Sequence, residues 1–346
     1  MPPGMMPMMP PMMFMPSGKQ RSFGRAIFST LATTVLFLSL LINFYFLVIE
    51  SAFSSGRGPQ EIVVAGGASD EKIVVLPVEG LVSGPMVAEM ERFLKLAEGD
   101  AKVKAVVVHV ETPGGTVAAS DEIYHRLVRF KEGRRLPLVV SMGSIATSGG
   151  YYISCAGDQI IASRSTLTGN IGVIFPRLNV SAMTERWGIV ENTLTAPRDG
   201  YKNAGSPFQK PATRDSEYLQ GLISQAYEQF KGVVAKSRGN KVKINEVADG
   251  RIMSAEEAKQ SGLVDQIGYL NDAVAAAASS AGLRNPTVVR YQPVPSFWAA
   301  LMGSSGDQDK AAPVGSMNVS GVKVEVNSRL LEELTTPRMM YLWRGN

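Results

Sequence analysis

The chain has very little histidine and cysteine, and this scarcity limits the chemistry it can perform. Its 346 residues include two histidines, His109 and His125, and one cysteine, Cys155. A single cysteine excludes an internal disulfide framework. There is no H-E-x-x-H motif, no Cys/His cluster, and no glycine fingerprint for phosphates or dinucleotides, so we expect neither a metal nor a cofactor.

The chain also carries little net charge. The net charge is +4, and Lys19, Arg21 and Arg25 supply three positive charges before the first apolar run, which leaves +1 for everything after it. No broad basic face therefore argues for nucleic acid as a partner. A hydrophobic content of 45% with 19% charged residues is typical of a folded protein with a sizeable core.

The N-terminal part consists of a biased tail followed by a long apolar run. Residues 1–18 are eight Met and six Pro with little else, and we expect 1–25 to be a disordered cytoplasmic tail. Residues 26–49 contain no charge. At 1.5 Å per residue, a helix of that length crosses the roughly 30 Å of bilayer hydrocarbon with some tilt.

This run predicts an uncleaved transmembrane helix. The main alternative is a cleaved signal peptide, whose apolar stretch is usually shorter, about 7–15 residues. A buried core helix fits the length and all-round apolarity less well. Positive charge precedes the run and Glu50 follows it. The positive-inside rule then places the N-terminus in the cytoplasm and the rest of the chain on the extracytoplasmic side of the inner (plasma) membrane.

The remaining chain divides into a linker, a folded domain and an extension. Residues 50–70 are rich in Gly, Ser and Ala and predict a linker. Over 71–283, apolar β-branched runs alternate with segments of helical spacing, which favours an α/β domain with parallel strands and right-handed crossovers. Residues 284–346 are expected to be a partly flexible C-terminal extension that ends in an apolar segment.

Several elements can be placed within this scheme. We expect a strand that begins at Lys72, and further strands at 101–110, 138–142 and 160–162. We expect helices at 86–98, 117–131, 217–238 and 254–261, the last begun by a capping box of Ser254 and Glu257. In the extension, 321–327 could be a strand and 329–333 a turn of helix.

Ser148 lies in the run S-I-A-T-S-G-G-Y-Y, between the strand at 138–142 and a predicted helix. A serine there meets free N–H groups and the positive end of the helix dipole. Gly149 and Gly150 would let a substrate backbone approach closely. Ser148 is therefore a candidate nucleophile, although a serine that only caps a helix would leave the same pattern.

The turn T-P-G-G, from Thr112 to Gly115, directly follows a buried strand. Ligands of open α/β sheets usually bind at this carboxyl edge. The N–H groups of Gly115 and Gly149 could together form an oxyanion hole, in which each donor is typically worth about 10²–10³ in rate. Taken alone, Pro-Gly-Gly also fits an ordinary turn.

A serine nucleophile needs a base, and no histidine follows Ser148. The best candidate is Lys202, in D-G-Y-K-N-A-G-S-P-F. A lysine amine has an unperturbed pKa near 10.4, so it can act as a base only when it is shielded from water. The small and aromatic neighbours of Lys202 suit a shielded lysine, although most lysines in loops lie on the surface.

Three segments together resemble the bacterial signal peptide peptidase A family of Ser-Lys proteases. They are T-S-G-G-Y-Y-I-S-C-A-G-D, T-G-N-I-G-V-I and Y-K-N-A-G-S-P-F, in the family's order, and the resemblance covers residues 72–283. It implies that Ser148 is the nucleophile and Lys202 the general base. It also implies a Clp protease/crotonase-like fold of stacked βαβ units.

Family resemblance further implies a homo-oligomer in which Ser and Lys come from neighbouring subunits. The implied substrates are spent signal peptides left in the membrane. One position departs from the family: where T-G-S-I-G-V is usual, with a serine that helps to hold the lysine, this chain has Asn170. An amide oxygen can also accept a hydrogen bond from the lysine, and Thr168 is a possible substitute.

Other functions use the same residues. A Ser-Lys protease that cuts a specific membrane-protein partner would look identical, and a catalytically inactive assembly protein on the same fold could retain the pattern. A Ser-His-Asp triad would have to use His109 or His125. We expect His109 to be a core or sheet-edge residue and His125 to face solvent. A crotonase-type acyl-CoA enzyme does not suit the membrane anchor.

Overall fold

The computed structural model describes residues 23–55, 59–198, 200–293, 313–319, 322–327 and 339–342. Residues 1–22 of the predicted tail and the predicted helical turn at 329–333 lie outside the described residues.

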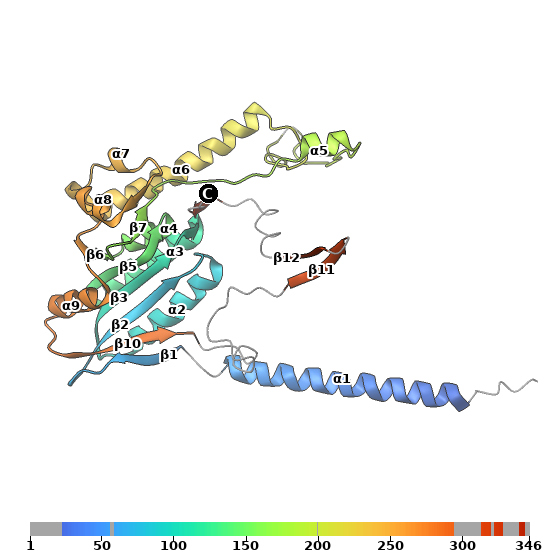
Figure 1. The fold of residues 1–346 in the computed structure, drawn as a ribbon, viewed down its shortest axis with the longest axis horizontal. Helices are drawn as coiled ribbons and strands as arrows, with labels where there is room; N and C mark the ends of the chain where they lie inside the picture. The colour runs from blue at the N-terminus through green and yellow to red at the C-terminus, as the bar shows by residue number, and fades with distance from the viewer. Residues whose placement is uncertain are drawn as a thin grey trace, which may run out of the picture.

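A mostly parallel β-sheet forms the centre of the protein (Figure 1). Its strand order is β1-β10-β2-β3-β5-β6-β9, with β1 antiparallel to β10 and the other neighbours parallel. Two short strands continue from β5: β7 pairs with it in parallel, and β8 pairs with β7. The bounds are β1 Gln60–Ala65, β2 Ser69–Glu79, β3 Val103–Thr112, β4 Gly114–Thr116, β5 Leu138–Thr147, β6 Gln159–Ala162, β7 Leu167–Gly169, β8 Ile252–Ser254, β9 Gln266–Ile267 and β10 Pro286–Gln292.

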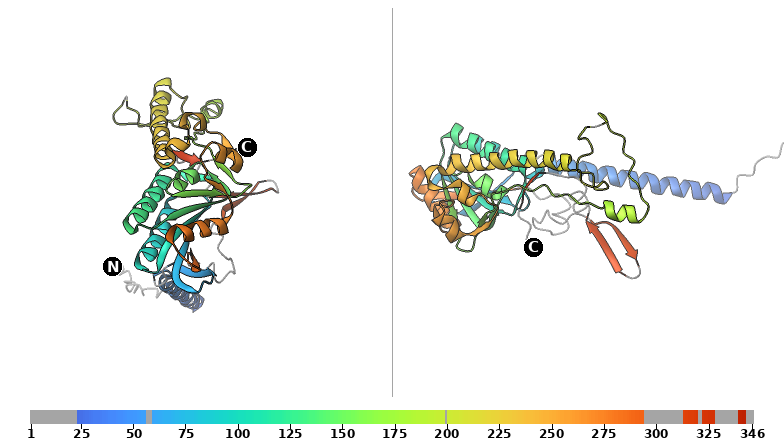
Figure 2. Two further views of the ribbon diagram at one scale, coloured as in Figure 1. Left: turned by 90° about the vertical axis from the view of Figure 1, so that its left-hand side faces the viewer. Right: turned by 90° about the horizontal axis from the view of Figure 1, so that it is seen from above.

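Helices cover both faces of this sheet (Figure 2). One face packs against α2, α3, α4 and α6 in the larger core, and the other packs against α9. The central strands are apolar on both faces because both are covered, as in V-K-A-V-V-V-H-V of β3. The helix bounds are α2 Gly84–Gly99, α3 Val117–Arg134, α4 Gly149–Ser154, α5 Ser181–Arg186, α6 Thr213–Arg238, α7 Ile244–Val247, α8 Ala255–Gln260 and α9 Leu270–Ala281, with a short 3-10 helix at Gly239–Lys241.

The predicted α/β class is confirmed, and the predicted helices and strands between residues 72 and 261 form with small shifts of their ends. The capping box of Ser254 and Glu257 is present, with bonds in both directions. Two strands of the central sheet lie outside the predicted domain of 71–283: β1 lies in the segment predicted as a linker, and β10 in the predicted extension. They are stabilised by each other and by β2, so neither is visible from local pattern alone.

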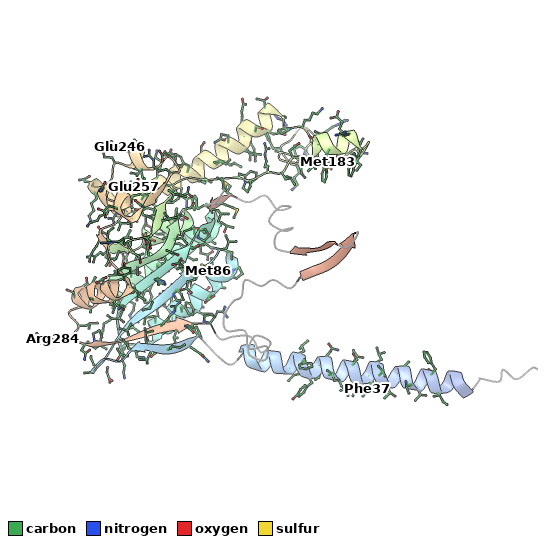
Figure 3. All side chains as sticks on the ribbon, in the orientation of Figure 1. Phe37, Met86, Met183, Glu246, Glu257 and Arg284 are labelled. Atoms are coloured by element: carbon green, nitrogen blue, oxygen red, sulfur yellow. The ribbon has the colours of Figure 1, made fainter. Side chains whose placement is uncertain are left out.

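An apolar helix, α1 (Phe23–Ser55), precedes the sheet. It begins and ends outside the predicted span of 26–49, and its 33 residues extend roughly 50 Å. Within it, Ile27–Val48 is long and apolar enough to cross a membrane, and none of that window is buried. In Figure 3 the labelled Phe37 projects away from the helix, and this side chain is 63% exposed. This one helix could be a transmembrane segment.

Residues 175–220, here called the arm, extend beyond the sheet (Figure 1). The arm contains α5 and the first turns of α6, and Met183 marks its outer part in Figure 3. Internal bonds hold it together, including those from the Val180 nitrogen to the Pro207 carbonyl (2.7 Å) and from the Asn179 amide to the Gln209 carbonyl (2.7 Å).

Two parts of the C-terminal region are described. β11 (Pro313–Val319) and β12 (Val322–Asn327) form an antiparallel pair, which confirms the predicted strand at 321–327. β13 (Met340–Leu342) returns to the main body and pairs antiparallel with β4.

Candidate active site

Ser148 occupies the junction between β5 and α4, as the sequence predicts. Its backbone has φ 55° and ψ −113°, a conformation that residues other than glycine rarely adopt. The residue is 1% exposed, and its side chain makes no capping hydrogen bond to α4. An ordinary helix cap would have extended backbone and a bonded hydroxyl. The strained backbone, which costs of order 1–3 kcal/mol, therefore distinguishes Ser148 from an ordinary helix cap.

The T-P-G-G turn is held against Ser148 by polar contacts. The Thr112 hydroxyl accepts a hydrogen bond from the Gly114 nitrogen (3.0 Å), and the Thr147 hydroxyl donates to the Pro113 carbonyl (3.2 Å). Gly114 has φ 103°, which requires glycine. Sequence reasoning missed both threonines, because their role depends on contacts between separate strands.

Gly149 allows this turn to approach the start of α4. A Cβ at Gly149 would lie 2.5 Å from the Ser120 hydroxyl oxygen and 3.1 Å from the Gly115 nitrogen. At Gly150 it would lie 2.8 Å from the Thr112 methyl carbon. The absent side chains thus make room for the protein's own turn and for Ser120 of α3; close approach of a substrate backbone stays a prediction.

The backbone N–H of Gly115 points away from Val82, which lies beside Gly115 on one side. The two residues that flank it bond to Val82: the Thr116 nitrogen donates to the Val82 carbonyl (2.9 Å), and the Gly114 carbonyl accepts from the Val82 nitrogen (2.8 Å). Because successive peptide groups of a strand point to opposite sides, the Gly115 N–H faces β13. The nitrogens of Gly115 and Gly149 therefore lie close together beside Ser148, as an oxyanion hole requires.

Thr168 and Asn170 lie near Ser148, because the Ser148 nitrogen donates to the carbonyl of Gly169, between them (2.9 Å). Thr168 is fully buried, and its hydroxyl donates to the Ala146 carbonyl (2.7 Å). Asn170 has φ 53°, and its amide nitrogen donates to the Gly250 carbonyl (2.6 Å). The Thr168 hydroxyl proton and one N–H of Asn170 are used in structural bonds, and each side chain keeps an oxygen able to accept.

Lys202 lies on the arm and is exposed in the single chain. Its neighbour Tyr201 stacks on Tyr218, near the start of α6, with ring centroids 4.5 Å apart. The α4 helix that follows Ser148 meets α6 much further along, where Tyr152 contacts Gln229. Tyr218 and Gln229 are separated by roughly 17 Å of helix. One chain therefore does not bring Lys202 to Ser148.

The two histidines lie on β3 and α3. His125 lies on α3 and is exposed, as expected. His109 is partly buried next to Gly143, and its Nδ1 is buried without a partner among the described residues. Burial lowers the pKa of His109, although the nearby Glu79 carboxylate opposes this shift. Among the described residues, no group of three or more His, Cys, Asp or Glu side chains could hold a metal ion.

The chain is similar in sequence to known peptidases. The pattern of peptidase family S49 matches residues 131–284. A putative signal peptide peptidase SppA from Enterococcus faecium is 32% identical over 316 residues, which cover 86% of this chain and 88% of that protein. Protease 4 of Haemophilus influenzae is 34% identical over 229 residues, 63% of this chain but 36% of that protein. Among solved structures, a ClpP1 mutant from Listeria monocytogenes matches with 16% identity and a TM-score of 0.39, and covers 58% of this chain and 94% of that one.

Proposed function

The chain belongs to peptidase family S49 and is a serine peptidase, and on this premise we propose that Ser148 and Lys202 form its catalytic dyad. The observation that supports the nucleophile is the backbone of Ser148, a buried non-glycine residue with φ 55° that makes no capping bond. The paired nitrogens of Gly115 and Gly149 support the proposed oxyanion hole.

In the proposed mechanism, the Ser148 oxygen attacks the carbonyl carbon of the peptide bond while its proton passes to the neutral Lys202 amine. The oxyanion that forms is stabilised by the Gly115 and Gly149 N–H groups. The carbon–nitrogen bond then breaks, and the leaving amine takes the proton from Lys202. Water attacks the resulting ester, again with Lys202 as the base, and releases the second product.

The base in this mechanism comes from a neighbouring copy of the chain. Lys202 is exposed and far from Ser148 in a single chain, whereas a base must be shielded and within hydrogen-bond reach. The arm that carries it exposes large apolar side chains, including Trp187 at 71%, Val190 at 85% and Leu194 at 93%. Contact with a second copy would cover these side chains and shield the lysine.

In the assembled site, Thr168 and Asn170 would position Lys202. Each has an oxygen able to accept from the amine, and Asn170 lines a cavity of about 390 Å³ between the 170–174 segment and α6. The arriving lysine would enter beside this segment.

We assign the substrates to apolar, extended peptides, such as spent signal peptides. The apolar α1 would hold the enzyme in the membrane where such peptides remain, and the name of the Enterococcus relative supports the same class. The positive charges before α1 favour a cytoplasmic N-terminus with the catalytic domain outside. Orientation can be tested with Tyr269→Cys, at a position 60% exposed: an impermeant maleimide should label it in intact spheroplasts. Labelling only after lysis would reverse the assigned orientation.

The dyad is tested with the full chain purified in detergent. Ser148→Ala and Lys202→Ala should each abolish peptide turnover and labelling by a serine-reactive acylating probe. Ser144→Ala, in the same run, and Lys210→Ala, an exposed lysine of the same arm, are matched controls that should retain both. Full turnover by Lys202→Ala would show that the base is another group.

Mixing the two inactive variants tests whether the site is shared. In random mixed assemblies, about one quarter of sites combine an intact serine with a neighbour's intact lysine, so about one quarter of wild-type turnover should return. Absence of rescue in a verified mixed oligomer would place both residues of each site in one chain.

A further inference from the structure

Asn43 places a side-chain amide inside the apolar window of α1. This window, Ile27–Val48, is apolar enough to cross a membrane, and Asn43 lies roughly 8 Å inside its end at Val48. The short side chain of asparagine does not reach the membrane surface from that depth, as the long stems of lysine and arginine do. Hydrocarbon holds no water to bond a polar group. The amide of Asn43 must therefore find its hydrogen-bond partners in protein.

Only part of this amide is used within its own helix. A side-chain amide has two N–H donors and an oxygen that accepts. The Asn43 nitrogen donates to the Ser39 carbonyl (2.7 Å), and its contact with the Ser39 hydroxyl oxygen, at 3.4 Å, is longer than an ordinary hydrogen bond. Among the described residues, the Asn43 side-chain oxygen accepts no hydrogen bond. One N–H and the oxygen thus remain for a partner outside α1.

Two threonine hydroxyls of α1 are, by contrast, satisfied locally. The Thr33 hydroxyl donates to the Ser29 carbonyl (2.7 Å), and the Thr34 hydroxyl donates to the Thr30 carbonyl (2.9 Å). Each of these bonds uses the hydroxyl proton within the helix itself. Neither threonine therefore requires a second helix.

A second copy of the chain offers Asn43 the partner it lacks. Among the described residues, α1 is the one helix that is long and apolar enough to span a membrane, so the partner has to come from another molecule. When two Asn43 amides face each other, the N–H left on each can donate to the oxygen of the other. This exchange is self-complementary, as the contact between two identical chains related by a two-fold axis must be. The two helices run in the same direction, because the same positive charges orient both copies.

We propose that α1 pairs with the α1 of a second copy through Asn43, and that this pairing holds together the copies that share an active site. The inference rests on the proposed function, in which α1 spans the membrane and Lys202 reaches Ser148 of another chain. Leu36 and Asn43 are seven residues apart, with Ser39 between them. This spacing places the three residues on one seam of two helices that coil around each other, where a polar side chain fixes the register of the pair.

Paired helices would bring the catalytic domains together. The connection between them and the sheet is short, since α1 ends at Ser55 and β1 begins at Gln60. Domains joined through so short a linker meet at an effective concentration on the order of 1 mM. The pairing of α1 should therefore keep shared sites assembled at dilutions at which separate domains would part.

The test uses the full chain in vesicles of phosphatidylethanolamine and phosphatidylglycerol, labelled with donor or acceptor dye at Tyr269→Cys, an exposed position. Asn43→Leu keeps the span apolar and removes the amide. It should weaken association about 3- to 30-fold, measured as energy transfer during dilution with lipid. Turnover per chain should fall at a correspondingly lower dilution. Asn43→Gln, which keeps an amide, should associate nearly as well as wild type, and Thr34→Val is the control that should not change association.

Oxidative cross-linking identifies the face that pairs. Leu36→Cys lies on the proposed seam and should form disulfide-linked dimers in the same vesicles. Leu38→Cys is its matched control, because two further residues turn the helix by about 200° and point the side chain away from the partner. Leu36 and Leu38 are 62% and 57% exposed in the single chain, so a difference between them would report the second copy.

Unchanged association in Asn43→Leu, or equal cross-linking of the two cysteine variants, would overturn this inference. So would cross-linking of Leu36→Cys to an added signal peptide that carries a cysteine and not to a second copy, because Asn43 would then face the substrate. Association and cross-linking are measured without turnover. Paired α1 helices in an enzyme whose Lys202→Ala variant stays fully active would contradict the proposed dyad and support the pairing, so the two failures are distinguishable.

Discussion

The spacing between Gly149 and the T-P-G-G turn can be tested by adding one methyl group. In Gly149→Ala, the new Cβ would lie 2.5 Å from the Ser120 hydroxyl oxygen, 3.1 Å from the Gly115 nitrogen and 3.2 Å from the Gly114 Cα. Ordinary contacts begin near 3.4 Å. The Ser120 hydroxyl and the turn must therefore both move, the turn by a few tenths of an ångström.

The movement should reduce catalysis more than stability. Complete loss of one oxyanion donor costs about 10²–10³ in kcat, equivalent to roughly 2.7–4 kcal/mol. A small displacement of the Gly115 N–H loses part of this, and we expect kcat to fall about 10- to 100-fold with little change in KM.

Ser120 supplies the matched control. Its hydroxyl makes one bond, to the Thr116 carbonyl (2.9 Å), so Ser120→Ala alone should cost about 1 kcal/mol of stability and leave kcat within about twofold. In the double variant Gly149→Ala with Ser120→Ala, the contact of 2.5 Å between the new Cβ and the Ser120 hydroxyl oxygen is gone. Most of the activity lost in Gly149→Ala should therefore return. Steady-state kinetics on assembled protein measures all three variants. Wild-type kcat in Gly149→Ala, or a double variant no better than Gly149→Ala, would refute the geometry assigned to these donors.

Three further outcomes follow from buried groups. Asp265→Asn should cost about 3–5 kcal/mol in denaturant unfolding, because Arg238, 3% exposed, would lose the one anionic partner it has among the described residues and one of its two bonds, of 2.7 and 2.9 Å, to that side chain. Lys241→Met, which removes a 62% exposed partner, should cost less than about 1 kcal/mol. Burial opposes ionisation of Asp265, but the hydrogen bonds from Arg238 and Lys241 prevail and lower its pKa from 3.8 to about 2. The ionised carboxylate therefore stabilises the folded state above pH 3.8, and the free energy of unfolding, measured against pH, should decline by roughly 2 kcal/mol as the pH falls through 2. Cys155 is buried, which raises its pKa to about 12, so a thiol reagent should modify it only after unfolding; rapid reaction in native protein would contradict its placement.

Local sequence patterns are sufficient for the elements that position the nucleophile. β3 and the first half of β5 are mostly apolar because both of their faces are covered, and this covering leaves a recognisable signal. The capping box at Ser254 is equally local, since both of its bonds join residues three positions apart. Such elements can be predicted from the composition and spacing of their own residues.

The remaining features depend on contacts between segments distant in sequence. β1 is exposed along its length and exists because β10 pairs with it. The backbone of Ser148 is held in its unusual conformation by bonds to Gly169 and Tyr152, and no residue pattern shows this. The distance between Lys202 and Ser148 is likewise absent from the sequence, because it depends on the direction in which α6 leaves the sheet.

The proposed dyad can act only when copies of the chain are assembled, because the base comes from another copy and such encounters become rarer on dilution. Turnover per chain should therefore fall when the enzyme is diluted below the concentration at which it assembles. Constant turnover per chain across a dilution series in which the protein becomes monomeric would instead place both residues of each site in one chain.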